Sequence, residues 1–282
     1  MGVFRFKRFE VVNELSAMKV NTDGVLLGAA MTLLPTDRRL LDVGTGTGTI
    51  ALMASQRLSD LLHNALIQPA TVNDSIVGQT SLGVHSTIGE TSIGVCRDYF
   101  ITGIDIDEPS AKEAAVNFTA SPWSDHLEAK HTSLQDYFPA HAGENESTSS
   151  PESVDLIFSN PPYFDNSLEA PDARRSGARH TSSLSYRDIF TFAERVLTES
   201  GRVSLVLPAD TEHDLCRYAR MCGLFPFRIL RIKTVARKAP GRIIAEFSRS
   251  RSETIYEELV INEAGGYSDA YKALTADFYV NL

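Results

Sequence analysis

The stretch Leu40-Leu41-Asp42-Val43-Gly44-Thr45-Gly46-Thr47-Gly48 decides which fold the sequence predicts. A short apolar segment runs directly into a glycine-rich turn, and residues 49–57 behind the turn have a helical pattern. A strand, a glycine turn and a helix in this order form the setting of a nucleotide-binding loop. The spacing G-x-G-x-G differs from the dinucleotide fingerprint, and no Lys-Ser/Thr pair follows to hold a triphosphate. The loop therefore favours a ligand that lacks a pyrophosphate.

From Arg39 onward, short apolar segments alternate with longer helical segments. The alternation predicts an α/β, doubly wound, Rossmann-like fold whose mostly parallel sheet is covered by helices on both faces. The predicted strands are residues 40–43, 100–104, 127–131, 154–158, 203–207, 229–235 and 243–247. The predicted helices are residues 49–57, 110–119, 186–198 and 211–221. The last two strands lack a helix between them, so they predict a hairpin that adds an antiparallel strand at one end of the sheet.

We predict a single domain that spans residues 1–282. Residues 1–38 precede the first sheet strand and form a flanking segment beside the ligand site. Residues 59–98 are rich in Ser, Thr, Gly and Asn and have no helical period, which is typical of an inserted flexible loop. Residues 141–152 have the composition of a solvated linker.

The amino-acid composition indicates which broad class of protein the chain belongs to. With 43% hydrophobic and 22% charged residues, the chain has the make-up of a water-soluble globular protein. No apolar run reaches the roughly 18–20 residues of a membrane span, and the N-terminus lacks a targeting pattern, so we expect a cytoplasmic protein without membrane contact. Cys96, Cys216 and Cys222 are scattered, so we predict neither a disulfide framework nor a bound metal. We also expect a monomer.

The net charge of −9 argues against non-specific attraction to nucleic acid. The basic residues are nevertheless clustered, because residues 228–251 contain eight Lys or Arg and one acid, Glu246. A second basic group follows residue 163 and comprises Arg174, Arg175, Arg179, His180 and Arg187. A local basic face can bind phosphates on an acidic protein. The alternative is that some of these arginines only solvate strand faces.

Two carboxylates lie close to the glycine loop in the predicted fold. Asp42 stands just ahead of the loop and could accept from a ligand ammonium group. Asp105 ends the next strand, Phe100-Ile101-Thr102-Gly103-Ile104-Asp105, and could accept from two ribose hydroxyls. Capping the following helix is the alternative role for Asp105, but Asp107 is better placed for it. Gly44, Gly46, Gly48 and these two acids are therefore candidate ligand-binding residues.

A second motif, Asn160-Pro161-Pro162-Tyr163, follows the apolar run of residues 154–159. An exocyclic amine on a ring is a poor nucleophile because its lone pair is delocalised. The carbonyl oxygens of Asn160 and Pro161 could accept its two hydrogens, the two prolines would stiffen the loop, and Tyr163 could stack on the base. Together with the glycine loop, the motif predicts methyl transfer from S-adenosylmethionine to a planar amino group.

Residues 40–247 resemble the class I S-adenosylmethionine-dependent methyltransferases. This resemblance implies that a residue after the third strand contacts the cofactor's adenine, a role that falls on Ser133, with Asp136 a turn later. It also implies that Asn160 lies against the cofactor.

A closer resemblance begins in the segment Ala17-Met18-Lys19-Val20-Asn21-Thr22-Asp23-Gly24-Val25-Leu26-Leu27-Gly28-Ala29. It is similar to the corresponding segment of the bacterial tRNA1(Val) adenine-37 N6-methyltransferases, and the likeness extends through the second motif to residues 267–279. The resemblance implies that Lys19, Thr22, Asp23 and Gly24 lie beside the cofactor. The same residues also predict a helix over residues 25–33 that is capped by Thr22 or Asp23.

The implied activity is methylation of the exocyclic N6 amine of adenosine 37 in the anticodon loop of tRNA1(Val). The residues implied to contact the tRNA are Arg174, Arg175, Arg179, Lys238 and Arg242. Release-factor glutamine N5-methyltransferases and rRNA guanine N2-methyltransferases share the two motifs and remain alternatives. A non-catalytic S-adenosylmethionine-binding protein is a third.

Overall fold

The computed structural model describes residues 2–67, 99–137, 153–162 and 184–281. The strands are β1 Val3–Arg5, β2 Glu10–Val12, β3 Arg39–Val43, β4 Phe100–Asp105, β5 Leu127–His131, β6 Val154–Ser159, β7 Leu197–Pro208, β8 Phe225–Val235, β9 Arg242–Ser248, β10 Ile255–Glu263 and β11 Gly266–Tyr267. The α-helices are α1 Thr22–Ala30, α2 Thr49–Ile67, α3 Glu108–Thr119, α5 Tyr186–Val196, α6 Glu212–Met221 and α7 Asp269–Thr275.

Among the described residues, the central sheet has nine strands in the order β11-β10-β8-β9-β7-β6-β3-β4-β5. The run from β7 to β5 is parallel throughout, and β9 is antiparallel to both β7 and β8. The predicted mostly parallel sheet with a late antiparallel hairpin is therefore confirmed. The predicted position of the hairpin is wrong in one respect, because β10 and β11 extend the sheet beyond β8.

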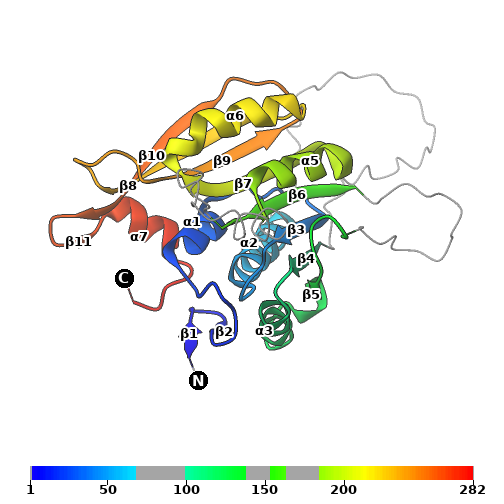
Figure 1. The fold of residues 1–282 in the computed structure, drawn as a ribbon. Coiled ribbons are helices and arrows are strands. Elements are labelled where there is room, and N and C mark those ends of the chain that lie inside the picture. The colour runs from blue at the N-terminus through cyan, green and yellow to red at the C-terminus, as the bar shows by residue number, and fades with distance from the viewer. Residues whose placement is uncertain (1, 68–98, 138–152, 163–183, 282) are drawn as a thin grey trace, which may run out of the picture.

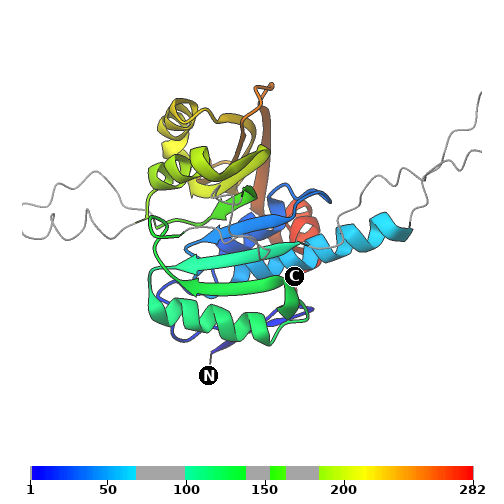
Figure 2. The same ribbon diagram turned by 90° about the vertical axis from the view of Figure 1, so that its right-hand side faces the viewer.

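Helices cover both faces of the sheet, as the doubly wound pattern predicts. α5 and α6 lie on one face, and α1, α2, α3 and α7 lie on the other (Figure 1). Successive side chains of a strand point to opposite faces. Within β3, Leu40 packs into the core under α1 and α2, whereas Leu41 and Val43 pack into the core under α5. Figure 2 shows the sheet from the side with a helical layer on each face.

The N-terminal segment is fastened to α3 by side chains that bind its backbone. The buried carboxylate of Glu113 accepts hydrogen bonds from the backbone N–H groups of residues 14, 15 and 16 at 2.6–2.9 Å. The Asn117 amide exchanges hydrogen bonds with the backbone of Val12. These bonds hold residues 14–18 across the end of β4 and lead the chain into α1.

Two sequence predictions about helices need correction. The N-cap of α1 is Asn21, whose Oδ1 accepts from Gly24 N–H at 2.8 Å, and neither Thr22 nor Asp23 has this role. α2 continues to Ile67, so the predicted insert over residues 59–98 begins inside a helix. Residues 68–98 and the predicted linker over residues 141–152 lie outside the described residues. Within the described ranges, no helix has the length and apolarity needed to cross a membrane.

Candidate functional site

A cavity of about 570 Å³ opens at the carboxyl ends of β3, β4 and β6. In open parallel sheets this edge is where ligands bind, and the volume falls in the range of small-molecule sites, about 300–1,000 Å³. Six predicted site residues line the cavity: Gly44, Gly46, Asp105, Ser133, Asn160 and Pro162. Ser16 and Met18 of the N-terminal segment line it as well.

The glycine loop adopts a conformation that favours glycine at three positions. Gly44, Gly46 and Gly48 have φ values of +71°, +56° and +79°. The N–H groups of Gly44 and Thr45 donate to the carbonyl oxygen of Ile104, which joins the loop to β4. Gly48 is absent from the cavity lining and packs against the Phe118 ring, where an added Cβ would clash.

Asp105 faces the cavity and also braces the loop. One carboxylate oxygen accepts from Gly46 N–H and the other from Asp107 N–H, each at 2.9 Å. A carboxylate has about four acceptor positions, so both oxygens keep capacity for ligand hydroxyls. Burial raises the pKa of Asp105. The Asp107 side chain accepts from Ser110 N–H and caps α3, as predicted.

Asp42 lies behind the loop and does not line the cavity. Its side chain is 0% exposed, and Oδ2 accepts from the Thr45 hydroxyl at 2.7 Å. Within the described part of the chain, its Oδ1 makes no hydrogen bond of normal geometry, although the Ala51 backbone N–H approaches the carboxyl and favours its charged form. Burial, reinforced by the negative charge of Asp105, raises the pKa of Asp42 to about 7. The direct ligand contact predicted for Asp42 is therefore not part of this arrangement.

Asn160 lies at the end of β6, where Ser159 Oγ donates to Val43 O at 2.6 Å and ties β6 to β3. The Asn160 side chain is 6% exposed, and its Nδ2 lies 3.4 Å from Asn21 Oδ1 and 3.5 Å from Met18 Sδ. Pro161 is buried behind the lining residue Pro162. Tyr163 lies outside the described residues.

The predicted adenine contact also lines the cavity, whereas Lys19 does not. Ser133 Oγ donates to Asp136 Oδ2 at 2.6 Å, and both residues face the cavity. Lys19 is exposed, and its Nζ donates to the carbonyl oxygen of Glu14 at 2.5 Å. The structure thus gives Lys19 a role in the fold of the N-terminal segment.

A second hollow, of about 460 Å³, lies on the other side of the α1 N-terminus. Thr22 and Asp23, predicted beside the cofactor, line this hollow, together with Arg242 and Tyr267. Asp23 forms an ion pair with Arg242 at 2.9 Å. Gly24 is buried in the first turn of α1 and lines neither cavity.

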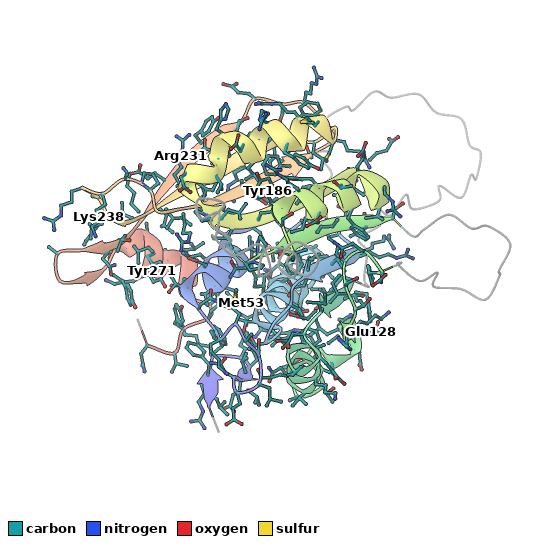
Figure 3. All side chains as sticks on the ribbon, viewed as in Figure 1. Met53, Glu128, Tyr186, Arg231, Lys238 and Tyr271 are labelled. Atoms are coloured by element: carbon teal, nitrogen blue, oxygen red, sulfur yellow. The ribbon has the colours of Figure 1, made fainter. Side chains whose placement is uncertain are left out.

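The predicted RNA-binding residues have different outcomes. Arg242 lines the second hollow. Lys238 is exposed in the turn between β8 and β9, and Tyr271 of α7 lies in the same part of the molecule (Figure 3). Arg174, Arg175 and Arg179 lie outside the described residues.

Sequence patterns missed the side chains that assemble the rim of the first cavity. Ser16 Oγ lies 3.1 Å from Ser110 Oγ and donates to Met18 O, which connects the N-terminal segment to α3. The Glu113 carboxylate accepts hydrogen bonds from the backbone N–H groups of the same segment. Glu113 and Asn117 are four residues apart, so the sequence places both polar side chains on one face of a helix. This spacing does not indicate which segment of the chain they bind.

Curated relatives match almost the whole chain. Proteins from Parabacteroides distasonis, Bacteroides fragilis (strain YCH46) and Mannheimia succiniciproducens are 34%, 33% and 32% identical to it. Each alignment covers 99% of this chain and 95–98% of the relative, and each relative is named tRNA1(Val) (adenine(37)-N6)-methyltransferase. No family model matches the chain.

A solved structure supports the fold. The crystal structure of a predicted O-methyltransferase from Agrobacterium tumefaciens aligns with a TM-score of 0.56 at 14% identity. The alignment covers 93% of this chain and 100% of that one. The predicted methyltransferase fold is thereby confirmed.

Proposed function

Because the chain belongs to the family of tRNA1(Val) (adenine(37)-N6)-methyltransferases, we propose that it methylates N6 of adenosine 37 in the anticodon loop of tRNA1(Val). The methyl donor is S-adenosylmethionine, and the enzyme acts in the cytoplasm as a monomer. The observation that carries the proposal is the position of Asn160 on the rim of the cavity that the glycine loop also lines.

The residues of the first cavity fit S-adenosylmethionine. Gly44 and Gly46 offer a backbone surface without side chains, and the Asp105 carboxylate suits ribose hydroxyls. Ser133 and Asp136 supply polar groups at the far wall, where they suit the adenine edge. Asp42 does not contact the cavity, but in its ionised form its negative charge behind the glycine loop favours a cationic ligand electrostatically. When bound, S-adenosylmethionine supplies an electrophilic methyl group on a sulfonium.

The chain's contribution to the reaction is to hold and orient the target amine. Asn160 Oδ1 and the Pro161 carbonyl oxygen accept the two N6 hydrogens, which draws the nitrogen lone pair away from the ring toward the methyl carbon. Gly44, Gly46 and Asp105 would hold S-adenosylmethionine so that its methyl carbon could be transferred to this nitrogen. The methylated nitrogen then loses one proton to water, so no strong general base is required. Tyr163 stacks on the adenine face.

The second hollow supports a role in RNA binding next to the reaction site. Asn21 touches Asn160, and the next two residues of α1 line the hollow, so a nucleotide beside the target base would lie within its reach. Tyr267 is 45% exposed and offers a stacking surface. Lys238 adds positive charge in the exposed turn between β8 and β9, and Arg242 lines the hollow in an ion pair with Asp23. Arg174, Arg175 and Arg179 complete the proposed phosphate contacts. An unstacked loop base costs less to extrude than a base in a duplex.

The relatives favour the tRNA substrate over release factor or rRNA guanine, because their match runs along the entire chain and is not confined to the two shared motifs. The experiment is incubation of the purified protein with labelled S-adenosylmethionine and either tRNA1(Val), release factor or ribosomal RNA. Nucleoside mass spectrometry of the tRNA should find N6-methyladenosine at position 37. Label in release factor or in guanine, with none in the tRNA, would replace this proposal by the corresponding alternative.

A further inference from the structure

Two linked amide side chains lie at the point where the N-terminal segment meets the candidate active site. Asn160 Nδ2 has two acceptors within reach, Asn21 Oδ1 at 3.4 Å and Met18 Sδ at 3.5 Å. An amide nitrogen carries two hydrogens, so both can be directed to the N-terminal segment. Because the amide group is planar, this arrangement turns its carbonyl oxygen away from Asn21.

The orientation of Asn21 is itself fixed by the backbone. Its Oδ1 accepts from Gly24 N–H at 2.8 Å as the N-cap of α1, and its Nδ2 donates to Lys19 O at 2.9 Å. A rotation of the Asn21 amide by 180° would place a donor against Gly24 N–H and an acceptor against a carbonyl oxygen. Helix capping therefore forces Asn21 to present an oxygen to Asn160.

We propose that Asn21 is a positioning residue that sets which end of the Asn160 amide faces the target amine. In the opposite Asn160 orientation, two amide oxygens would face each other, and the amine would meet an N–H donor in place of an acceptor. Both consequences disfavour that orientation. This inference rests on the proposed role of Asn160. It adds a function for Asn21, which neither the glycine loop nor the Asn160–Tyr163 motif contains.

The three substitutions that test the proposal separate helix capping from amide positioning. Asn21→Ser keeps a good N-cap, but its shorter side chain cannot reach Asn160. Asn21→Asp keeps an oxygen toward both Gly24 and Asn160 and gives up only the donation to Lys19 O. Asn21→Ala removes both interactions. We expect the kcat for tRNA methylation to fall by about fivefold to tenfold in Asn21→Ser and to stay within about twofold in Asn21→Asp.

Three further measurements exclude a general structural effect. The melting temperature and the S-adenosylmethionine affinity of Asn21→Ser should match those of the wild type, whereas Asn21→Ala should lose stability. In an Asn160→Asp background, which has no amide nitrogen to orient, Asn21→Ser should cause no further loss in single-turnover rate.

The outcomes distinguish this inference from the proposed function. If the wild-type protein modifies adenosine 37 and Asn21→Ser has an unchanged kcat, the positioning role is wrong and the proposed function stands. An equal loss in the wild-type and Asn160→Asp backgrounds would likewise overturn it, because Asn21 would then act through another group. If the wild-type protein does not modify tRNA, the proposed function itself fails.

Discussion

Replacement of Asp42 by Asn should stabilise the ligand-free protein progressively as the pH rises, and should weaken its binding of S-adenosylmethionine. Asp42 is fully buried behind the glycine loop, and its Oδ1 makes no hydrogen bond of normal geometry among the described residues. Ionisation is therefore costly in the folded state. Asn has nearly the same shape and cannot ionise, and its side-chain oxygen can still accept from Thr45.

The sign of the pH dependence follows from the direction of the pKa shift. Burial raises the pKa of Asp42 from its ordinary value of 3.8 to about 7. Between these values the folded protein binds the proton more tightly than the unfolded chain, so the wild type loses stability as the pH rises through this window. Each pKa unit corresponds to about 1.4 kcal/mol, which gives a loss of up to roughly 4 kcal/mol that is complete above pH 7.

A competing effect is independent of pH. The Asp42→Asn substitution would place an N–H donor in a fully buried position beside the backbone N–H of Ala51, and a buried donor that is left unpaired costs about 1–3 kcal/mol at every pH. The predicted quantity is thus the change in the stability difference between variant and wild type. This difference should shift in favour of Asp42→Asn by several kcal/mol from about pH 4 to pH 8.

Urea unfolding of the two proteins at pH 4, 5, 6, 7 and 8 measures this change, with Asp125→Asn as the control at an exposed carboxyl. Calorimetry at pH 8 should show weaker binding of S-adenosylmethionine to Asp42→Asn, because the variant lacks the buried negative charge. A stability difference that stays constant across this pH range would refute the reasoning about Asp42 ionisation.

Three further predictions concern the proposed contacts. Asp105→Ala should weaken S-adenosylmethionine binding by roughly 1–3 kcal/mol in calorimetry, and unchanged affinity in a folded variant would exclude the ribose contact. Asn160→Ala should lose most of its kcat and keep its cofactor affinity, because it acts mainly in the transition state; methylation at the wild-type rate would contradict this role. Lys238→Ala should make the salt dependence of tRNA affinity shallower, and an unchanged slope would exclude a phosphate contact at the β8–β9 turn; Tyr267→Ala should raise the KM for tRNA and keep the slope, and an unchanged KM would remove the second hollow from the RNA interface.

The sheet core was predictable because its strands carry strong local signals. β3, β4, β6 and the second half of β7 are short segments rich in apolar residues, and most of their residues are buried, as expected of strands covered on both faces. The extension of α2 was also present in the sequence, since Leu58, Leu61, Leu62 and Ala65 follow helical spacing. The Ser-, Thr- and Gly-rich residues that follow led to the prediction of an insert over residues 59–98, which included the end of this helix. β10 gave no such signal, because most of its side chains are exposed or half-buried and several are acidic.

The rim of the site could not be derived from local patterns. Glu113 binds backbone N–H groups 97–99 positions away, and any peptide N–H could satisfy the same carboxylate. Three consecutive residues, Asn21, Thr22 and Asp23, are all good N-caps, so the sequence could not choose among them. The choice of Asn21 depends on how the N-terminal segment packs against α3 and Asn160, which is a property of the folded chain.

The carboxylates at the carboxyl ends of β3 and β4 couple the stability of the protein to ligand binding. Asp42 and Asp105 lie near enough for the charge of Asp105 to raise the pKa of Asp42, so ionisation of both is unfavourable in the ligand-free protein. A cation in the cavity favours the charged form of each carboxylate and should lower both pKa values. By linkage, the cation must then bind more tightly above pH 7 than below it. We therefore predict that the two carboxylates make the site selective for a positively charged methyl donor over its neutral-sulfur product, at the cost of stability in the ligand-free enzyme.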